Sequence, residues 1–512
     1  MPASADRSDR PPAAFRSAAR AGSAEPDPVP RARQVRVLAG VLAGGRPTRR
    51  RRRDTGRDPG PGSGAVGRLA ARTADAVRRS ASAPAARGAL ALARRARQRP
   101  DATAERGASA RRKLTLVIVL AVVAGTLGAC GGSRGGTVDF YSSLPLSGAS
   151  AARARAIVNG AKLALAQARG RAGQFTVRYV SLDDSTGQAG TWDPGRTAAN
   201  ARTAARDPKA VYYIGEYDSG ASEISIPILN RAGVPQVSPA NTYVGLTTSE
   251  PGSLPGEPTK YYPTHKRTYL RIVPRDTIQA AALVELMHSD GCAKVALANY
   301  GDTYGRGLAR LSALEALGLG VTIVSDTGID TTAANYRSYA QRIKAQGVDC
   351  FMFAGTTSRP AVKLVTDVNA TIPTARIYGG DGICERAFTD PARHGIPARI
   401  APLFKCTLPV YGLADDPGGK RFLSAYRAAY GDSHPDPYAI YGYEAMKLGL
   451  DTVAGLGSNG NDKAAVLAAL FATNRNSVLG AYEFDPNGDT TLSDYGVYTV
   501  ANGLPTFSSA IQ

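Results

Sequence analysis

Ser219 is a residue whose position in the sequence is typical of an anion-binding site. It follows the apolar run AVYYIG (210–215) and stands where a helical segment begins. A hydroxyl group beside the free backbone N–H groups of a helix N-terminus can bind an anion. Ser219 could equally be an ordinary helix N-cap. The local sequence leaves both roles open.

Several motifs that would indicate catalysis or a cofactor are missing or stand in the wrong context. The segment 455–460 (GLGSNG) matches G-x-G-x-x-G but follows a helix, which indicates a linker. The segment 485–489 (DPNGD) is similar to a calcium loop, but it lacks the distal Glu and suits a hairpin turn. No nucleophile–base–oxyanion set is visible. We therefore expect no enzyme activity, no cofactor and no metal.

Four cysteines follow Cys130, namely Cys292, Cys350, Cys384 and Cys406. An even number in an exported protein favours disulfides. Cys292 and Cys350 each precede an apolar run, and they lie side by side if those runs are neighbouring parallel strands. Cys384 and Cys406 would close a loop of about 20 residues, worth roughly 3 kcal/mol in the entropic model. Zinc is the alternative, but no C-x-x-C spacing occurs and the histidines are scattered.

The formal charge of +21 is concentrated at the N-terminus. Residues 1–113 hold 27 basic and 9 acidic residues, whereas the rest of the chain holds 36 and 33. Rich in Ala, Arg, Pro and Gly, residues 1–110 are expected to be a disordered basic extension. A start codon assigned too far upstream and a real cytoplasmic tail both fit this composition. A nucleic-acid-binding arm fits least, because no aromatic residues interleave with the charges.

Residues 111–129 predict a secretory signal peptide. Three basic residues precede an uncharged stretch from Leu114 to Ala129, which is shorter than the roughly 20 residues of a membrane span. The segment 127–130 (LGAC) resembles the lipobox of bacterial lipoproteins, which implies lipidation of Cys130. The alternative is a short membrane helix with a buried cysteine. Residues 130–136 then form a flexible tether.

From Thr137 onward, apolar runs of five or six residues alternate with helical segments about every 25–30 residues. This alternation predicts βαβ units and an α/β fold with parallel sheets. Such a long series fits two sheets better than one. Near the C-terminus, three helical segments precede LGAYEFDPNGD and YGVYTVANG, which we expect to form a strand, a turn and a strand.

The mature chain resembles the branched-chain amino-acid-binding proteins (Leu/Ile/Val type) of ABC importers, which have the type I periplasmic binding protein fold. The resemblance extends from Thr137 to the C-terminus. It is carried by PLSG at 145–148, NGA at 159–161, DD at 183–184, GEYDS at 215–219, SPANT at 238–242, LT at 246–247, YGRG at 304–307 and GDG at 380–382.

The resemblance implies two Rossmann-like lobes with a ligand cleft between them. We expect one lobe from 137–272 plus 409–483 and the other from 273–408 plus 484–512. Three crossover segments, near Val273, Leu408 and Phe484, would join them. A cleft at the carboxyl ends of the strands also agrees with the rule for open α/β sheets.

The resemblance also implies roles for individual residues. Ser219 would bind the carboxylate of an amino acid, and the carbonyl group of Ala240 would accept a hydrogen bond from its ammonium. Thr242 would contact both ends of the ligand. Asp381 would pair with the ammonium in a partly desolvated cleft, where charge-assisted hydrogen bonds are strong. Tyr304 would extend from the second lobe and help to close the cleft.

The sequence departs from the family pattern at the ligand site. Arg153 and Thr356 stand where family members can have aromatic residues, and Asp218 adds a carboxylate beside Tyr217 and Ser219. We include these residues among the candidate ligand contacts. Such a pocket is more polar than one built for leucine, so a related small polar solute is also a candidate ligand.

These features predict a monomeric solute-binding lipoprotein anchored on the extracytoplasmic face of the cell membrane. Its partners would be a small-molecule ligand, ABC permease subunits and, through the lipid anchor, the membrane, but not nucleic acid. A sensory ligand-binding protein is the alternative. It is disfavoured because neither a second membrane span nor a signalling domain follows in this sequence.

Overall fold

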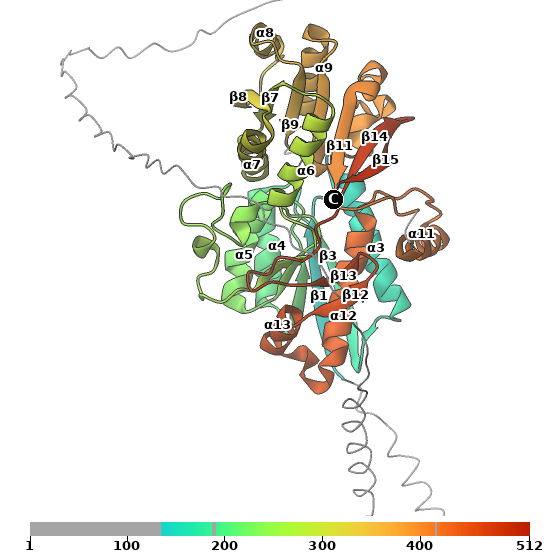
Figure 1. The fold of residues 1–512 in the computed structure, drawn as a ribbon. Helices are drawn as coiled ribbons and strands as arrows, with labels where there is room; N and C mark the ends of the chain where they lie inside the picture. The colour runs from blue at the N-terminus through green and yellow to red at the C-terminus, as the bar shows by residue number, and fades with distance from the viewer. Residues whose placement is uncertain (1–134, 187–190, 415–416, 512) are drawn as a thin grey trace, which may run out of the picture. The chain divides into compact units, whose positions relative to one another are not determined.

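The computed structural model describes residues 135–186, 191–414 and 417–511. The predicted basic extension, the signal peptide and Cys130 lie outside the described residues. The described part contains two separate large sheets and one small hairpin. Figure 1 shows helices packed around both large sheets.

The first sheet has the strand order β2-β3-β1-β4-β5-β6 and is parallel except at β2. Its strands are β1 (Thr137–Leu144), β2 (Arg171–Ala172), β3 (Phe175–Asp183), β4 (Ala210–Ile214), β5 (Gln236–Ser238) and β6 (Tyr269–Arg271). The helices that connect or return to it are α3 (Ala151–Gln167), α4 (Pro194–Arg206), α5 (Ser219–Ala232), α11 (Pro417–Tyr430), α12 (Ala439–Gly455) and α13 (Lys463–Phe471). We call this group the first lobe.

The second sheet has the strand order β15-β14-β11-β10-β9-β7-β8. Strand β14 is antiparallel to both of its neighbours, β11 and β15, and the other neighbouring strands are parallel. Its strands are β7 (Lys294–Asn299), β8 (Thr322–Gly328), β9 (Cys350–Ala354), β10 (Arg376–Gly379), β11 (Phe404–Leu408), β14 (Tyr495–Ala501) and β15 (Leu504–Ile511). The helices α6 (Asp276–Ser289), α7 (Thr303–Leu319), α8 (Arg337–Ala345), α9 (Arg359–Thr371) and the short α10 (Arg386–Thr389) complete the second lobe.

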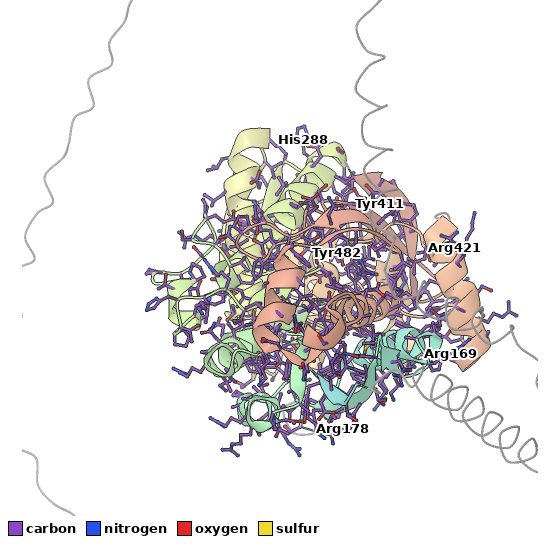
Figure 2. The ribbon with its side chains drawn as sticks, turned by 90° about the horizontal axis from the view of Figure 1, so that it is seen from below. Arg169, Arg178, His288, Tyr411, Arg421 and Tyr482 are labelled. Atoms are coloured by element: carbon purple, nitrogen blue, oxygen red, sulfur yellow. A yellow bond between two sulfur atoms is a disulfide. The ribbon has the colours of Figure 1, made fainter. Side chains whose placement is uncertain are left out.

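The predicted α/β fold with two parallel-rich sheets is confirmed. Central strands such as β4 and β9 are buried at every residue, because helices cover both faces of each sheet. This is why these strands are continuous apolar runs in the sequence. Charged side chains such as Arg169, Arg178 and Arg421 lie on the outside, whereas Tyr482 is buried (Figure 2).

Helix α12 packs closely against α3 and so returns the chain to the first lobe. Two glycines permit this approach. A Cβ atom on Gly160 would lie 1.9 Å from the carbonyl oxygen of Ala439, and one on Gly442 would lie 2.0 Å from that of Ile157. Any side chain at either position would push the helices apart, so the NGA segment at 159–161 has a packing role.

The chain passes between the two lobes after β6, after β11 and after β13 (Gly480–Glu483). The predicted strand, turn and strand near the C-terminus are confirmed, since β13 leads into a turn at 485–489 and β14 follows it. The turn is a hairpin turn, because Phe484 forms an antiparallel bridge with Thr490 and the backbone N–H of Asp485 donates to the carbonyl oxygen of Asp489. The two strands belong to different sheets: β13 pairs with β12 (Asn474–Ser477), whereas β14 pairs with β15 and β11. The third crossing starts at this turn.

Arg271 holds this third crossing against the first sheet. Its backbone N–H donates to the carbonyl oxygen of Gly488, and its Nε lies 2.7 Å from Oδ1 of Asp489. Nη1 donates to the carbonyl oxygens of Asn241 and Tyr243 at 3.2 and 2.8 Å. The guanidinium is fully buried, so these partners must compensate its lost hydration.

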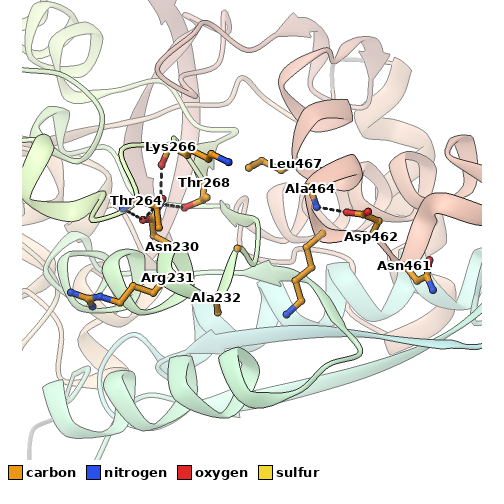
Figure 3. Close-up of a pocket in the computed structure, with 12 residues that line it drawn as sticks. Asn230, Arg231, Ala232, Thr264, Lys266, Thr268, Asn461, Asp462, Ala464 and Leu467 are labelled. Atoms are coloured by element: carbon orange, nitrogen blue, oxygen red, sulfur yellow. Dashed lines mark hydrogen bonds between the residues drawn. The ribbon is translucent and has the colours of Figure 1, made fainter.

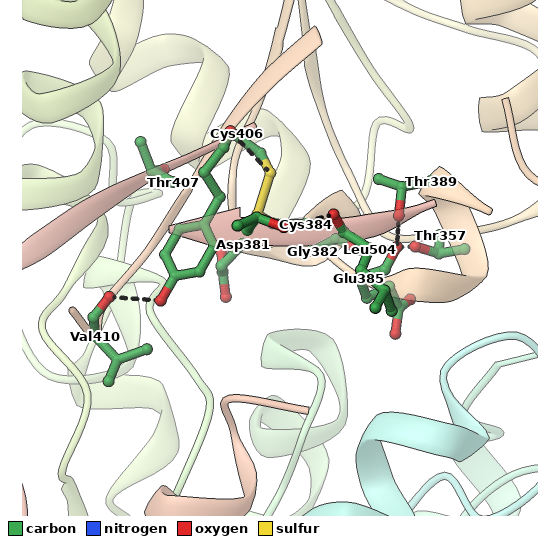
Figure 4. The surroundings of a disulfide bond; sticks show 12 residues. Thr357, Asp381, Gly382, Cys384, Glu385, Thr389, Cys406, Thr407, Val410 and Leu504 are labelled. Atoms are coloured by element: carbon green, nitrogen blue, oxygen red, sulfur yellow. Dashed lines mark hydrogen bonds between the residues drawn. A yellow bond between two sulfur atoms is a disulfide. The ribbon is translucent and has the colours of Figure 1, made fainter. Parts of the chain in front are cut away.

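The structure brings the four cysteines together in the predicted pairs. Cys292 and Cys350 have their sulfur atoms 1.99 Å apart, next to the parallel pairing of β7 with β9. The sulfur atoms of Cys384 and Cys406 are 2.09 Å apart. This second pair ties the segment that carries Asp381 to strand β11 (Figure 4).

We predict that Asp489→Ala lowers the free energy of unfolding by about 3–5 kcal/mol, because it leaves the buried Arg271 without its counter-ion. Lys447→Ala is the control. It removes an ion pair to Asp451 in which both side chains are at least 40% exposed, so it should cost less than about 1 kcal/mol. Urea denaturation measures both, and equal effects would contradict the assigned role of Asp489.

Candidate ligand-binding site

A small cavity lies between the two lobes, at the carboxyl ends of strands from both sheets. Its volume is about 20 Å³. The first lobe lines it with residues that follow β4 and β5, and the second lobe with residues that follow β7, β9 and β10. The lining residues are Tyr217, Asp218, Ser219, Ala240, Thr242, Tyr304, Thr356, Asp381 and Gly382.

The first-lobe wall is built on the N-terminus of α5. Asp218 is the N-cap residue, but its carboxylate makes no capping hydrogen bond. Ser219 begins the helix and is 4% exposed. A helix N-terminus directs N–H groups and a partial positive charge toward this wall. The wall can therefore receive an anionic group.

Two hydrogen bonds hold the neighbouring loop in place. The Ser238 hydroxyl accepts from the backbone N–H of Asn241 at 2.9 Å, and the Asn241 side-chain amide donates to the carbonyl oxygen of Tyr217 at 2.7 Å. These bonds join the loop after β5 to the loop after β4. Ala240 and Thr242 consequently reach the same cavity as Ser219.

Asp381 is the charged group of the second-lobe wall. Its Oδ1 accepts from the Tyr304 hydroxyl at 2.7 Å, and its Oδ2 accepts from the Tyr438 hydroxyl at 2.6 Å. Burial first, and then the charge of Asp381, raise the pKa of both phenols, which keeps them protonated as donors. Each carboxylate oxygen has a second lone pair, so Asp381 can still accept a bond from a ligand cation.

Tyr438 precedes α12 and belongs to the first lobe, so its bond to Asp381 crosses the cleft. The sequence analysis did not select this residue. It stands in an aromatic-rich helical segment, and nothing local indicates that it meets a residue 57 positions earlier. Gly382 was selected only as part of the GDG segment.

Arg153 lies near the cavity without lining it. Its Nη1 donates to the carbonyl oxygen of Asp381 at 2.6 Å, and its Nη2 donates to that of Cys384. Its Nε lies 3.0 Å from the Asp436 carboxylate. The structure thus places this candidate contact as a buried link between the lobes, whereas the other eight candidates line the cavity.

Several buried carboxyl groups surround the cavity. Desolvation raises the pKa of Glu216 from 4.5 to about 7, and it raises that of Glu385 similarly, although Arg153 opposes the latter shift. Desolvation and nearby carboxylates hold the pKa of Asp184 and Asp276 well above the ordinary range. The protein therefore disfavours the ionised forms of these carboxyl groups.

A larger hollow of about 790 Å³ lies at the opposite end of the first lobe, between the start of α13 and the loops that precede β5 and β6 (Figure 3). The Asn230 side chain there is satisfied by the protein. It donates to Lys266 and Thr268 and accepts from Thr264. Ligands of open α/β sheets bind at the carboxyl ends of strands, so the interlobe cavity is the better candidate.

The sequence profile of the family described as periplasmic binding protein matches residues 142–504. The chain belongs to this family. Periplasmic binding proteins are extracytoplasmic solute-binding proteins. Within the described part of this member, none of the helices is both long enough and apolar enough to span a membrane.

Two curated relatives are similar over most of their length. An amino acid binding protein of Pseudomonas aeruginosa is 26% identical over 326 residues, which are 63% of this chain and 78% of the relative. The Leu/Ile/Val-binding protein homolog 2 of Brucella abortus is 24% identical over 385 residues, 73% of this chain and 93% of the relative.

Solved structures share the fold at lower identity. A leucine-binding protein of Thermotoga maritima has a TM-score of 0.61 and 22% identity, covering 73% of this chain and 99% of that chain. A solute-binding protein of an ABC transporter from R. palustris, in complex with benzoate, has a TM-score of 0.60 and 18% identity, covering 73% and 96%. The predicted family and its two-lobe fold are confirmed.

We predict that stability falls as pH rises through the pKa of Glu216. A carboxyl whose pKa is 4.5 when unfolded and about 7 when folded stabilises the fold fully below 4.5 and loses this contribution as pH rises through 7. The loss is on the order of 3 kcal/mol. Glu216→Gln keeps an acceptor for the Tyr213 hydroxyl and should show a smaller decline between pH 5 and 8.

Urea denaturation at several pH values measures this difference. Glu285→Gln, at an exposed position on α6, is the control and should follow the wild type. A pH dependence of Glu216→Gln identical to that of the wild type would show that Glu216 does not titrate in this range.

Proposed function

We propose that this protein is the solute-binding subunit of an ABC importer and that it captures an amino acid by closure of its two lobes. The α-carboxylate would lie at the N-terminus of α5, near Ser219 and Thr242. The ammonium would lie at Asp381. Closure would bring both ends of the ligand into contact with protein, and the permease would recognise the closed shape.

The main support for this proposal is that an anion-binding group and a cation-binding group line opposite sides of one cavity. A helix N-terminus with a hydroxyl group lines one side, and a carboxylate held by two phenols lines the other. An amino acid has the complementary pair of charges. The curated relatives that are named as amino-acid-binding proteins support the same ligand class.

Aromatic acids are the competing ligand class, since solute-binding proteins of the same fold hold benzoate or 4-hydroxybenzoate. Benzoate has no ammonium group. Its carboxylate could occupy the N-terminus of α5, as that of an amino acid would, but it would leave Asp381 without a cationic partner. Asp381 therefore favours the amino acid.

The proposal includes export and covalent anchoring. Cys130 would become the lipidated N-terminus on the extracytoplasmic face of the membrane. The pairs Cys292–Cys350 and Cys384–Cys406 would be disulfides, which form in that oxidising location. The second disulfide would keep the segment 381–384 next to β11 and so support the position of Asp381.

We predict that Asp381→Asn weakens amino-acid binding by about 2–5 kcal/mol, because the ammonium loses its charged partner in a desolvated cleft. Tyr438→Phe is the matched control. It removes one hydroxyl donor to the Asp381 carboxylate and keeps the charge, so its cost should be smaller, at most about 1.5–3 kcal/mol. A thermal-shift screen of amino acids, benzoate and 4-hydroxybenzoate identifies a ligand, and calorimetry then compares the variants.

Wild-type affinity in Asp381→Asn would contradict the ammonium assignment. If the aromatic acids raise the melting temperature and no amino acid does, the ligand is an aromatic acid and the proposed ligand class is wrong. Ser219→Ala should cost about 1.5–3 kcal/mol, because a hydroxyl donor to a carboxylate is lost.

We predict that mass spectrometry of the protein isolated from native membranes finds a lipid-modified N-terminal Cys130 and two disulfide-linked peptide pairs. Non-reducing digestion preserves the pairs, and a reduced sample is the control. An unmodified peptide that spans Ala129 and Cys130 would contradict lipidation, and four free thiols would contradict the disulfides.

A further inference from the structure

Asp218 has no evident structural task. It occupies the N-cap position of α5 without a side-chain capping bond. Among the hydrogen bonds and ion pairs of the described residues, none involves its carboxylate, which lines the interlobe cavity together with Asp381. By comparison, the N-cap residues Asp302 and Asp462 each accept backbone N–H groups of their helices.

The walls around Asp218 contain several acidic groups and few basic ones. The cavity lining contains two carboxyl groups and no basic residue. Behind it lie the buried carboxyl groups of Asp184, Asp276 and Glu385, and among the described residues only Glu385 has an ion-pair partner, Arg153 at 3.8 Å. Burial first, and then Asp184, Asp302 and Glu385, raise the pKa of the Asp218 carboxyl.

Arg153 does not offset this charge. Its guanidinium is already bonded to Asp436 and to two backbone carbonyl oxygens, and its Nε lies 3.8 Å from Glu385. A neutral zwitterionic amino acid would bring one ammonium for Asp381. Such a ligand would leave the carboxyl group of Asp218 without a cationic partner, so nothing would compensate its burial.

We propose that the ligand is a basic amino acid whose side-chain cation pairs with Asp218 while its α-ammonium pairs with Asp381. This inference rests on the proposed function and specifies its substrate class. Both carboxyl groups line the same cavity between the lobes, so a solute that enters the cleft while the lobes are apart can reach both. A cation beside these buried acidic groups favours their ionised forms and gains ion pairs that a neutral solute cannot make.

The test compares ligands that differ by one terminal group. Ornithine and norleucine have the same chain, ending in an ammonium or a methyl group, and 2,4-diaminobutyrate and norvaline form a shorter pair. Calorimetry with the wild-type protein should give the basic member of at least one pair a 10- to 150-fold higher affinity, the range expected for a charged hydrogen bond.

Asp218→Asn should abolish this preference by lowering the affinity for the basic member of a pair to that for its neutral counterpart. Asn is a good N-cap residue of similar shape, so α5 should remain intact, and the unfolding midpoint verifies this. Asp462→Asn is the matched control. It removes the same charge from a helix N-cap at the far end of the first lobe, and it should retain the preference.

The outcomes separate the two proposals. Equal affinities for the basic and the neutral members in the wild type would overturn the basic-ligand inference and leave amino-acid binding standing. A preference that survives Asp218→Asn would overturn the assignment of Asp218. The absence of binding by any amino acid would refute the proposed function itself.

Discussion

The carboxyl ends of the strands of two sheets meet at one cleft, and the other features of the binding site depend on this arrangement. The chain crosses three times between the sheets, and the buried ion pair of Arg271 with Asp489 fastens the third crossing to β6. Loops that follow parallel strands then face one another. A helix N-terminus and carboxylates from distant parts of the chain therefore line one cavity, and each strand contributes only a few of its residues.

Bonds across the cleft show how closure can be coupled to the ligand site. Tyr438 from the first lobe donates to the Asp381 carboxylate, and Arg153 donates to the backbone of the same residue. Asp381 is therefore both a candidate ligand contact and the acceptor of the bonds that join the lobes. A cation bound at this carboxylate acts where the two lobes already meet, which would couple occupancy of the site to the closed shape.

The same cleft contains more buried carboxyl groups than the nearby arginines can neutralise. Glu216, Asp184 and Asp276 have raised pKa values because they are desolvated and lie near one another or near Asp381. Such an arrangement costs stability as pH rises, because deprotonation leaves buried charges without partners. A cationic solute bound in the cleft would favour the ionised forms and offset this cost.

The sequence by itself determined the alternation of strands and helices, the family and the candidate residues after each strand, because these features depend on local patterns and on turns at the ends of strands. All these candidates except Arg153 line the cavity. Only the tertiary structure decided that Arg153 joins the lobes, that Tyr438 meets Asp381, and that the two strands flanking the turn at 485–489 belong to different sheets. Tyr438 and Arg153 contact Asp381 from 57 and 228 positions away, so no local pattern encodes these contacts, and they exist only after the chain has crossed between the lobes.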